Sequence, residues 1–420
     1  MNRQPFRLKS PQWDARLSPF WVRLMRPLRR RKQVRDQRLL QISVRGAERM
    51  RPLVEQNAGI LITPNHPSHA DCYAMYEAAE SLGRPFYFMT AWQVLAMSNR
   101  FQRWVLRRHG SFSVEREGAD LWAFKRAVRV LVEESYPLVI FPEGDVYHLN
   151  DKVTPFRDGT AAIALTASRQ TERPLYVVPC ALRFEYVEDP TRQLESVMTE
   201  LEERILWRPR PHLPLSERIY HFAEALLSVK ELEYAGTVGR GSLRERIEAL
   251  VDHVLSGLEQ AHGLKNGGQT VPERVKNVRR ACLEEQEKAA DDPARLMALR
   301  TQLDDVFFVV QLFSYPGDYV KSRPTIERLA ETLDKFEEDV LGYPTARIRG
   351  TRRAIVEFGE PIDVRQFAEG MTQPRKASRP LTNAVERAVQ ALLDGDQPKP
   401  SPPVATDEAS TAGVRELQAK

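Results

Sequence analysis

Cysteine is scarce in this sequence, and the few cysteines are widely spaced. The 420 residues contain only Cys72, Cys180 and Cys282. Three distant cysteines provide neither a disulfide framework nor the paired spacing of a structural metal site. We therefore expect a fold held together by an ordinary hydrophobic core, which 42% hydrophobic residues in a chain of this length can build.

Long apolar runs are also missing. No stretch approaches the roughly 18 consecutive apolar residues that a membrane-spanning helix needs. Charged residues from Arg3 onward interrupt any apolar region of the signal-peptide type. The sequence therefore predicts no transmembrane span and no signal peptide.

Acidic residues are rare at one end of the chain. Residues 1–50 hold fourteen Lys and Arg against three Asp and Glu, a net charge of +11 in a chain of net charge +5. Within residues 13–32 a set of apolar side chains recurs at helical spacing, with most arginines elsewhere around the helix. The apolar set is Leu17, Phe20, Trp21, Leu24, Met25 and Leu28.

Such a helix can lie in a membrane interface, so we expect residues 1–40 to be a basic amphipathic segment that associates with the cytoplasmic face of a membrane. The alternative is a helix docked on the protein's own core with its arginines in solvent. Pro19 and Pro27 limit the helix to short pieces in either case.

The rest of the chain divides by pattern into further regions. In residues 41–190 short apolar, β-branched runs alternate with helix-period stretches, which predicts an α/β fold with a mostly parallel sheet flanked by helices. Residues 191–342 are long, charged and helix-periodic, and indicate a helical insertion. Residues 343–395 return to the α/β region with a strand near Ile355 and a terminal helix. Residues 396–420 are rich in Pro, Ser and Ala and are predicted to be disordered.

The stretch "ITPNHPSHADC" (Ile62 to Cys72) combines two histidines and an aspartate between a predicted strand and a predicted helix. Open α/β sheets place ligands at this kind of strand-to-helix turn. His66 and Asp71 are five residues apart, so they converge only if His66 lies in the turn and Asp71 in the first turn of the helix. A carboxylate beside an imidazole fixes its tautomer and stabilises the imidazolium that forms when the base takes a proton.

Three further motifs follow in order: "GSFSVER", "FPEG" and "VVP". Together with "NHPSHAD" they resemble the four blocks of the glycerolipid acyltransferase family, typified by 1-acylglycerol-3-phosphate acyltransferase. "PFRDG" after the third block and "VEFGEPIDV" near the end are also similar to that family. The resemblance covers roughly residues 41–190 and 352–364.

The resemblance implies roles for individual residues. His66 would be the general base and Asp71 its partner, acting on the hydroxyl of a lysophospholipid or glycerol-phosphate-type acceptor that attacks an acyl thioester. Gly110, Phe112 and Arg116 of the second block, with Glu143 and Gly144 of the third, would bind the acceptor. Pro179 of the fourth block would lie on the donor side.

The resemblance also implies an acyl donor, and one departure from the family's pattern bears on the acceptor. The acyl donor would be acyl-CoA or acyl-carrier protein, with no metal or other cofactor and no nucleic acid. The family commonly continues Thr-Arg-Ser after the third block, where this chain has Asp145, Val146 and Tyr147. This departure removes a cation from the acceptor side and favours a lysophospholipid with another head group, or another hydroxylated lipid.

Several alternatives remain open on the residues alone. Arg116 could form a surface ion pair with the neighbouring Glu117, Glu143 could cap a helix, and Pro179 could end a strand. The group His66, His69 and Asp71 could serve a metal-dependent hydrolase, although the other histidines show no companion metal spacing. The chain could also be a basic-tailed membrane-binding adaptor without catalysis, or could use Cys72 as a covalent nucleophile.

Overall fold

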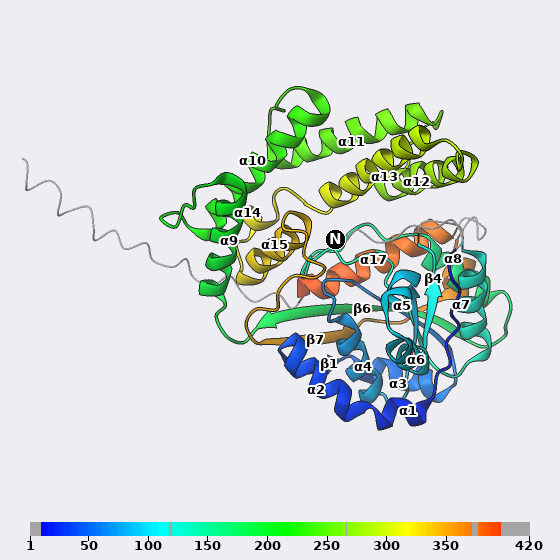
Figure 1. The fold of residues 1–420 in the computed structure, drawn as a ribbon. Coiled ribbons are helices and arrows are strands. Elements are labelled where there is room, and N and C mark those ends of the chain that lie inside the picture. Colours follow the sequence, from blue (N-terminus) through cyan, green and yellow to red (C-terminus); the bar gives the residue numbers. More distant parts are fainter. Residues whose placement is uncertain (1–9, 117–119, 266, 372–376, 396–420) are drawn as a thin grey trace, which may run out of the picture.

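The computed structural model of the protein describes residues 10–116, 120–265, 267–371 and 377–395 (Figure 1). The predicted disordered tail, residues 396–420, lies outside the described residues. The strands are β1 (Leu39–Arg45), β2 (Gly59–Pro64), β3 (Tyr87–Ala91), β4 (Ser111–Val114), β5 (Leu138–Val139), β6 (Leu175–Tyr186), β7 (Arg352–Phe358) and β8 (Ile362–Asp363).

Helices occupy the segments between these strands and most of residues 191–339. They are α1 (Pro19–Leu24), α2 (Arg26–Gln37), α3 (Ala47–Glu55), α4 (Asp71–Ser81), α5 (Trp92–Met97), α6 (Arg100–Arg108), α7 (Leu121–Glu133), α8 (Gly159–Ser168), α9 (Thr191–Leu206), α10 (Leu215–Ala235), α11 (Leu243–Ala261), α12 (Val271–Lys288), α13 (Pro293–Phe313), α14 (Tyr319–Ser322), α15 (Ile326–Asp339), α16 (Val364–Glu369) and α17 (Ser378–Gly395). No helix in the described part of the chain is long and apolar enough to cross a membrane.

The strands form one sheet in the order β1-β7-β6-β2-β5-β3-β4, with β8 paired to β6. Strand β1 pairs with β7 in parallel. The neighbours in the series β6-β2-β5-β3-β4 also pair in parallel. The pairings of β6 with β7 and β8 are antiparallel. The predicted fold class, a mostly parallel sheet flanked by helices, is confirmed. The strand near Ile355 is β7, and it rejoins the sheet between β1 and β6.

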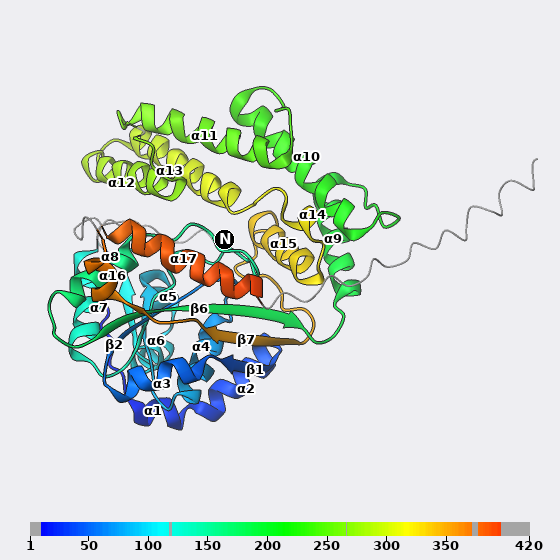
Figure 2. The same ribbon diagram turned by 180° about the vertical axis from the view of Figure 1, so that it is seen from behind.

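Helices cover both faces of the sheet because its central strands are apolar on both faces. In β6, Val177 and Ala181 pack with α7, α8 and α17, while Val178, Cys180 and Leu182 pack with α3 and α4. This alternation is the two-residue period of a strand. Figures 1 and 2 both show α17 lying along β6, between the sheet and helices α10 to α13.

The basic N-terminal segment forms two short helices that dock on the α/β region. Pro19 and Pro27 each lie in the first turn of a helix, where a missing N–H costs nothing. Arg29 is buried and donates to Glu80 of α4, and Arg30 pairs with Glu77 at 2.6 Å. The apolar face is divided, since part of it packs inward and part stays in solvent. The exposed members are Phe20 (65%), Leu24 (56%) and Leu28 (51%).

Helices α9 to α15, which we call the helical region, have hydrophobic cores separate from the sheet. One core joins α10, α11, α12 and α13 around Leu255 and Val306. A second joins α9, α10 and α15 around Leu201 and Leu333. The helical region stands over the face of the sheet that α17 covers (Figures 1 and 2).

Candidate functional site

The turn between β2 and α4, residues 65–70, carries the first candidate residue at the carboxyl end of a buried strand. His66 Nδ1 lies 2.6 Å from Asp71 Oδ2, and the backbone N–H of Ser68 donates to the same oxygen at 3.2 Å. Asp71 is the first residue of α4. The two side chains therefore converge as the spacing predicts, with the imidazole in the turn and the carboxylate at the start of the helix.

The two members of this pair have different environments. Asp71 is 1% exposed, whereas the His66 side chain is 23% exposed and its ring stacks on Phe141 with centroids 4.1 Å apart. Burial raises the pKa of Asp71, although the hydrogen bond from His66 opposes the rise. A carboxylate shielded from water interacts strongly with the ring that it contacts. The contact with Asp71 fixes Nδ1, so a proton transfer by this ring would use Nε2.

Asn65 fixes the position of the turn, and the sequence analysis gave it no role. Its side-chain oxygen accepts from Leu182 N at 2.7 Å, and its amide donates to Leu182 O at 3.0 Å. The side chain is fully buried. It replaces a backbone pairing between the turn and β6, and so sets where His66 stands. The only sign of this role in the sequence was the position of the asparagine directly before the histidine.

Glu143 of the "FPEG" block is a second clamp on the turn. Its Oε1 accepts from the backbone N–H of His66 at 2.7 Å, and its Oε2 accepts from Thr154 N at 3.0 Å and from the Thr154 hydroxyl. Burial raises the pKa of Glu143 to about 7. Both carboxylate oxygens are thus occupied by donors of the protein, which makes Glu143 a link between the turn and the loop that follows β5.

Arg116 of the "GSFSVER" block reaches the same loop. Its Nη1 donates to Gly144 O at 2.6 Å and lies 3.3 Å from Asp145 Oδ1. Burial opposes ionisation of Asp145, but Arg116 and Arg157 together hold its pKa below the usual value. The ion-pair partner of Arg116 seen here is Asp145; Glu117, the partner considered from the sequence, lies outside the described residues.

The other motif residues lie in the framework. Gly110 has φ +91, and a Cβ there would lie 2.4 Å from Phe86 O. Phe112 is fully buried in the core. Gly144 has φ +81, and a Cβ there would lie 2.5 Å from Arg157 Nε. Pro179 is a buried residue of β6 in register with Thr63, and its carbonyl accepts from Gly359 N at 2.8 Å.

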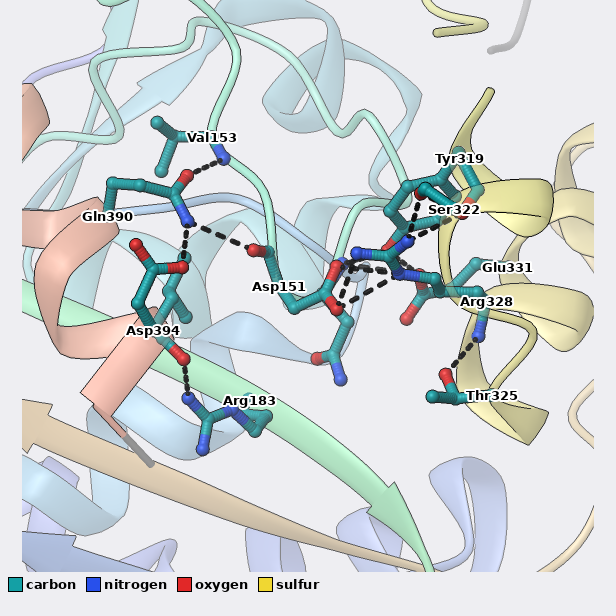
Figure 3. Close-up of polar contacts among 12 residues, drawn as sticks. Asp151, Val153, Arg183, Tyr319, Ser322, Thr325, Arg328, Glu331, Gln390 and Asp394 are labelled. Carbon is teal, nitrogen blue, oxygen red and sulfur yellow. Dashed lines mark hydrogen bonds and ion pairs between the residues drawn. The ribbon is translucent and has the colours of Figure 1, made fainter. Parts of the chain in front are cut away.

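The loop after β5, residues 140–158, joins the α/β region to the helical region. Figure 3 shows Asp151 contacting Arg328 of α15, with Nε···Oδ2 at 3.0 Å, and Tyr319, whose hydroxyl donates at 3.0 Å. On the other side, Gln390 of α17 donates to Asp151 O at 3.1 Å and accepts from Val153 N at 3.0 Å. The loop is therefore held from three directions, by the turn, by α15 and by α17.

An apolar cavity of about 360 Å³ lies in the helical region, bordered by α10, α11, α13, α14 and α15. Its volume is within the usual range for small-molecule pockets. Among its polar wall residues, Lys335 is buried, and burial lowers its pKa to about 7. Residues of the loop after β5 also contribute to the wall. The wall includes Leu226, Ile247, Phe308, Leu312, His148 and Leu149.

The structure groups other residues than the three considered for a metal-dependent hydrolase. His66 and Asp71 contact each other, but His69 Nε2 lies 3.4 Å from Glu338 Oε1 of α15. Within the described residues, the three side chains that could hold a metal ion together are His69, His148 and Glu338. Sequence spacing could not reveal this group, because Glu338 follows His69 by 269 residues and His148 by 190 residues.

Part of the chain matches a known protein family. Residues 41–183 match the family model described as Acyltransferase. A search of curated proteins finds no match to the chain. The matched segment begins in β1 and ends in β6, so it contains the turn with His66 and Asp71, Arg116 and the loop after β5. Through residues 41–183 this chain is similar to the acyltransferase family, which supports a general acyl-transferring activity.

Proposed function

We propose that the protein transfers a fatty acyl group from acyl-CoA or acyl-carrier protein to a hydroxyl of a lysophospholipid, with His66 as the general base and Asp71 as its partner. The observation that carries the proposal is the 2.6 Å contact between His66 Nδ1 and the buried Asp71, at a ring that keeps access to solvent. A buried carboxylate that holds one nitrogen orients the other toward a substrate and stabilises the protonated ring.

In the proposed reaction Nε2 of His66 takes the proton from the acceptor hydroxyl as the oxygen attacks the thioester carbonyl. The tetrahedral intermediate then collapses to the ester as the C–S bond breaks, and the thiolate receives the proton. Thiols ionise near pH ~8.5, so the leaving group needs little acid assistance. A well-placed general base contributes about 10²–10⁴-fold to such a step.

For the acceptor we propose a head group that carries a phosphodiester. Arg116 contacts Asp145, so its charge toward a ligand is partly neutralised, which suits an anion of lower charge than a phosphate monoester. We further propose that Glu143 acts by positioning the His66 backbone, and that Gly110, Phe112, Gly144 and Pro179 shape the walls of the site. Their burial and their contacts with the chain support these roles.

For the apolar chain of one substrate we propose the cavity of the helical region. Its wall includes His148. The preceding residue, Tyr147, donates its backbone N–H to His66 O at 3.3 Å. The cavity wall thus begins next to the turn. Burying a chain in apolar space is favourable by about 0.8 kcal/mol for each CH₂.

We propose that the enzyme works at the cytoplasmic face of a membrane as a peripheral protein. An aromatic cluster extends from α1 to α6. The rings of Trp21 and Trp104 are in edge contact, with their centroids 5.0 Å apart, and the exposed rings of Phe20 and Phe101 lie beside them. Aromatic rings next to arginines suit the boundary between lipid head groups and acyl chains.

The proposed function is tested by measuring free thiol released from acyl-CoA in the presence of a panel of lysolipids. Wild type should release thiol only with an accepted lysolipid, and His66→Ala should fall to near background while retaining the wild-type circular dichroism spectrum. His221→Ala, at an exposed helical histidine, is the matched control and should keep wild-type turnover. Undiminished turnover in His66→Ala would exclude His66 as the base.

A further inference from the structure

Three side chains from distant parts of the sequence meet beside the turn that carries His66. His69 belongs to that turn, His148 to the loop after β5, and Glu338 to α15. The Nε2 atoms of His69 and His148 each lie 3.4 Å from Glu338 Oε1. The possible ligand atoms of the three residues all lie within 4.8 Å of one another.

The two 3.4 Å separations are longer than a normal N–H···O hydrogen bond, which spans about 2.7–3.2 Å. They match the distance between two ligand atoms on the edge of a tetrahedron around Zn²⁺. With zinc bonds of about 2.0–2.1 Å and a tetrahedral angle, that edge is about 3.3–3.4 Å. The geometry is therefore better suited to ligands around an ion than to direct hydrogen bonding.

His148 provides an independent indication. Its side chain is 8% exposed, and its Nε2 has no hydrogen-bond partner within the part of the chain that the structure describes. Buried polar atoms normally have partners, and one without a partner calls for an explanation. His148 also has φ +51, a left-handed backbone conformation that non-glycine residues adopt mainly where the surroundings demand it.

Glu338 contributes a fixed carboxylate. Its side chain is 1% exposed, and its Oε1 also accepts from Ala346 N at 3.0 Å. An imidazole, a second imidazole and a carboxylate form a ligand set typical of zinc sites that leave a fourth position for water.

We propose that His69, His148 and Glu338 bind one Zn²⁺ ion, and that this ion fastens α15 of the helical region to the turn that carries His66. The ion provides a partner for the buried His148 nitrogen. It is separate from the His66–Asp71 pair, because His66 Nδ1 already contacts Asp71. The proposal of a zinc site does not depend on the proposed acyl-transfer function.

The test is a count of bound zinc on the full-length protein. The protein is stripped with a chelator, dialysed, reloaded with Zn²⁺, separated from loose metal by gel filtration and measured by elemental analysis. Wild type should retain about one zinc per chain, whereas His148→Ala and Glu338→Gln should retain at least tenfold less. Co²⁺ loaded in place of zinc should give wild type the intense visible absorption of a tetrahedral site and give neither variant that absorption.

Two controls make the result decisive. His221→Ala and Cys282→Ser should bind zinc like wild type; the second matters because Cys282 Sγ lies 3.3 Å from His262 and could attract metal by itself. If the buried variants fail to fold, His69→Ala tests the site instead, since the His69 side chain is 42% exposed. Wild type without stoichiometric zinc, or zinc fully retained in His69→Ala, would overturn the proposal. His66→Ala should keep its zinc whether or not it loses activity.

Discussion

The α/β region and the helical region surround the site by different means. In the α/β region polar side chains hold the turn through backbone groups, as Asn65 does with Leu182 and Glu143 does with His66. In the helical region the cavity wall consists mainly of apolar side chains from several helices. Proton transfer requires a geometry fixed to a fraction of an ångström, whereas an apolar chain requires only space of suitable size. Changes in the first region should therefore act on rate, and changes in the second on substrate choice.

The largest effect is expected in the α/β region, from Asp71→Asn. The amide keeps the size of the side chain but removes the charge that stabilises a protonated His66, so kcat should fall by about 10²–10⁴-fold with KM nearly constant. Steady-state thiol release measures both constants. A fall confined to KM would show that Asp71 serves binding, which would break the contrast between the two regions.

The next effect concerns stability and pH, at Glu143. Its folded pKa of about 7 lies above the ordinary value, so between about pH 4.5 and pH 7 the folded protein retains a proton that the unfolded chain releases. This contribution to the free energy of unfolding is fully present below about pH 4.5 and is lost as pH rises through 7, by about 3 kcal/mol at most.

Glu143→Gln mimics the protonated carboxyl and should remove that loss. Urea unfolding between pH 4.5 and pH 7.5 should give a free energy that falls less steeply with pH in Glu143→Gln than in wild type. Parallel curves for the two proteins would mean that Glu143 titrates alike in the folded and unfolded states.

A smaller effect is expected in the helical region, from Ala223→Phe. Ala223 lines the cavity, so the added ring should reduce kcat/KM for long acyl chains by about tenfold and leave short chains nearly unaffected. Ala225→Phe changes the same helix outside the cavity wall and is the matched control. Equal losses across all chain lengths in Ala223→Phe would separate the cavity from substrate binding.

The smallest effect is expected from Cys72→Ser. Cys72 is exposed on α4, next to Asp71 in the sequence. Because the proposed reaction passes through no covalent enzyme intermediate, thiol release should stay within about twofold of wild type. Loss of all turnover in Cys72→Ser would instead favour a cysteine nucleophile.

Much of the α/β region was predictable because its signals are local. The apolar runs that contain β2 (Gly59–Pro64) and β5 (Leu138–Val139) form strands, and the helix-period stretch from Asp71 is a helix. His66 and Asp71 are close in the sequence, so one turn brings them together. The antiparallel pairing of β7 with β6 was not predictable, because it depends on how the chain returns after the helical region.

The contacts missed from the sequence are all long-range. Glu143 reaching the His66 backbone, Arg328 reaching Asp151, and Glu338 reaching His69 each join segments with no shared periodicity. Charged helical residues such as Glu338 normally lie in solvent, and their pattern gives no sign of burial. The division of the chain into residues 41–190, 191–342 and 343–395 stays a prediction.

The antiparallel pairing of β6 with β7 has a consequence for the chain as a whole. Tyr186 is in register with Arg352, and Val187 N donates to Thr351 O at 2.8 Å. The helical region thus leaves and re-enters the sheet at one point, like an enlarged hairpin loop. Because its two ends are already adjacent, replacing residues 188–350 with a tight glycine-containing turn would require little rearrangement of either strand. The same junction would allow an entire bundle of helices to be inserted or removed at a single point of the sheet.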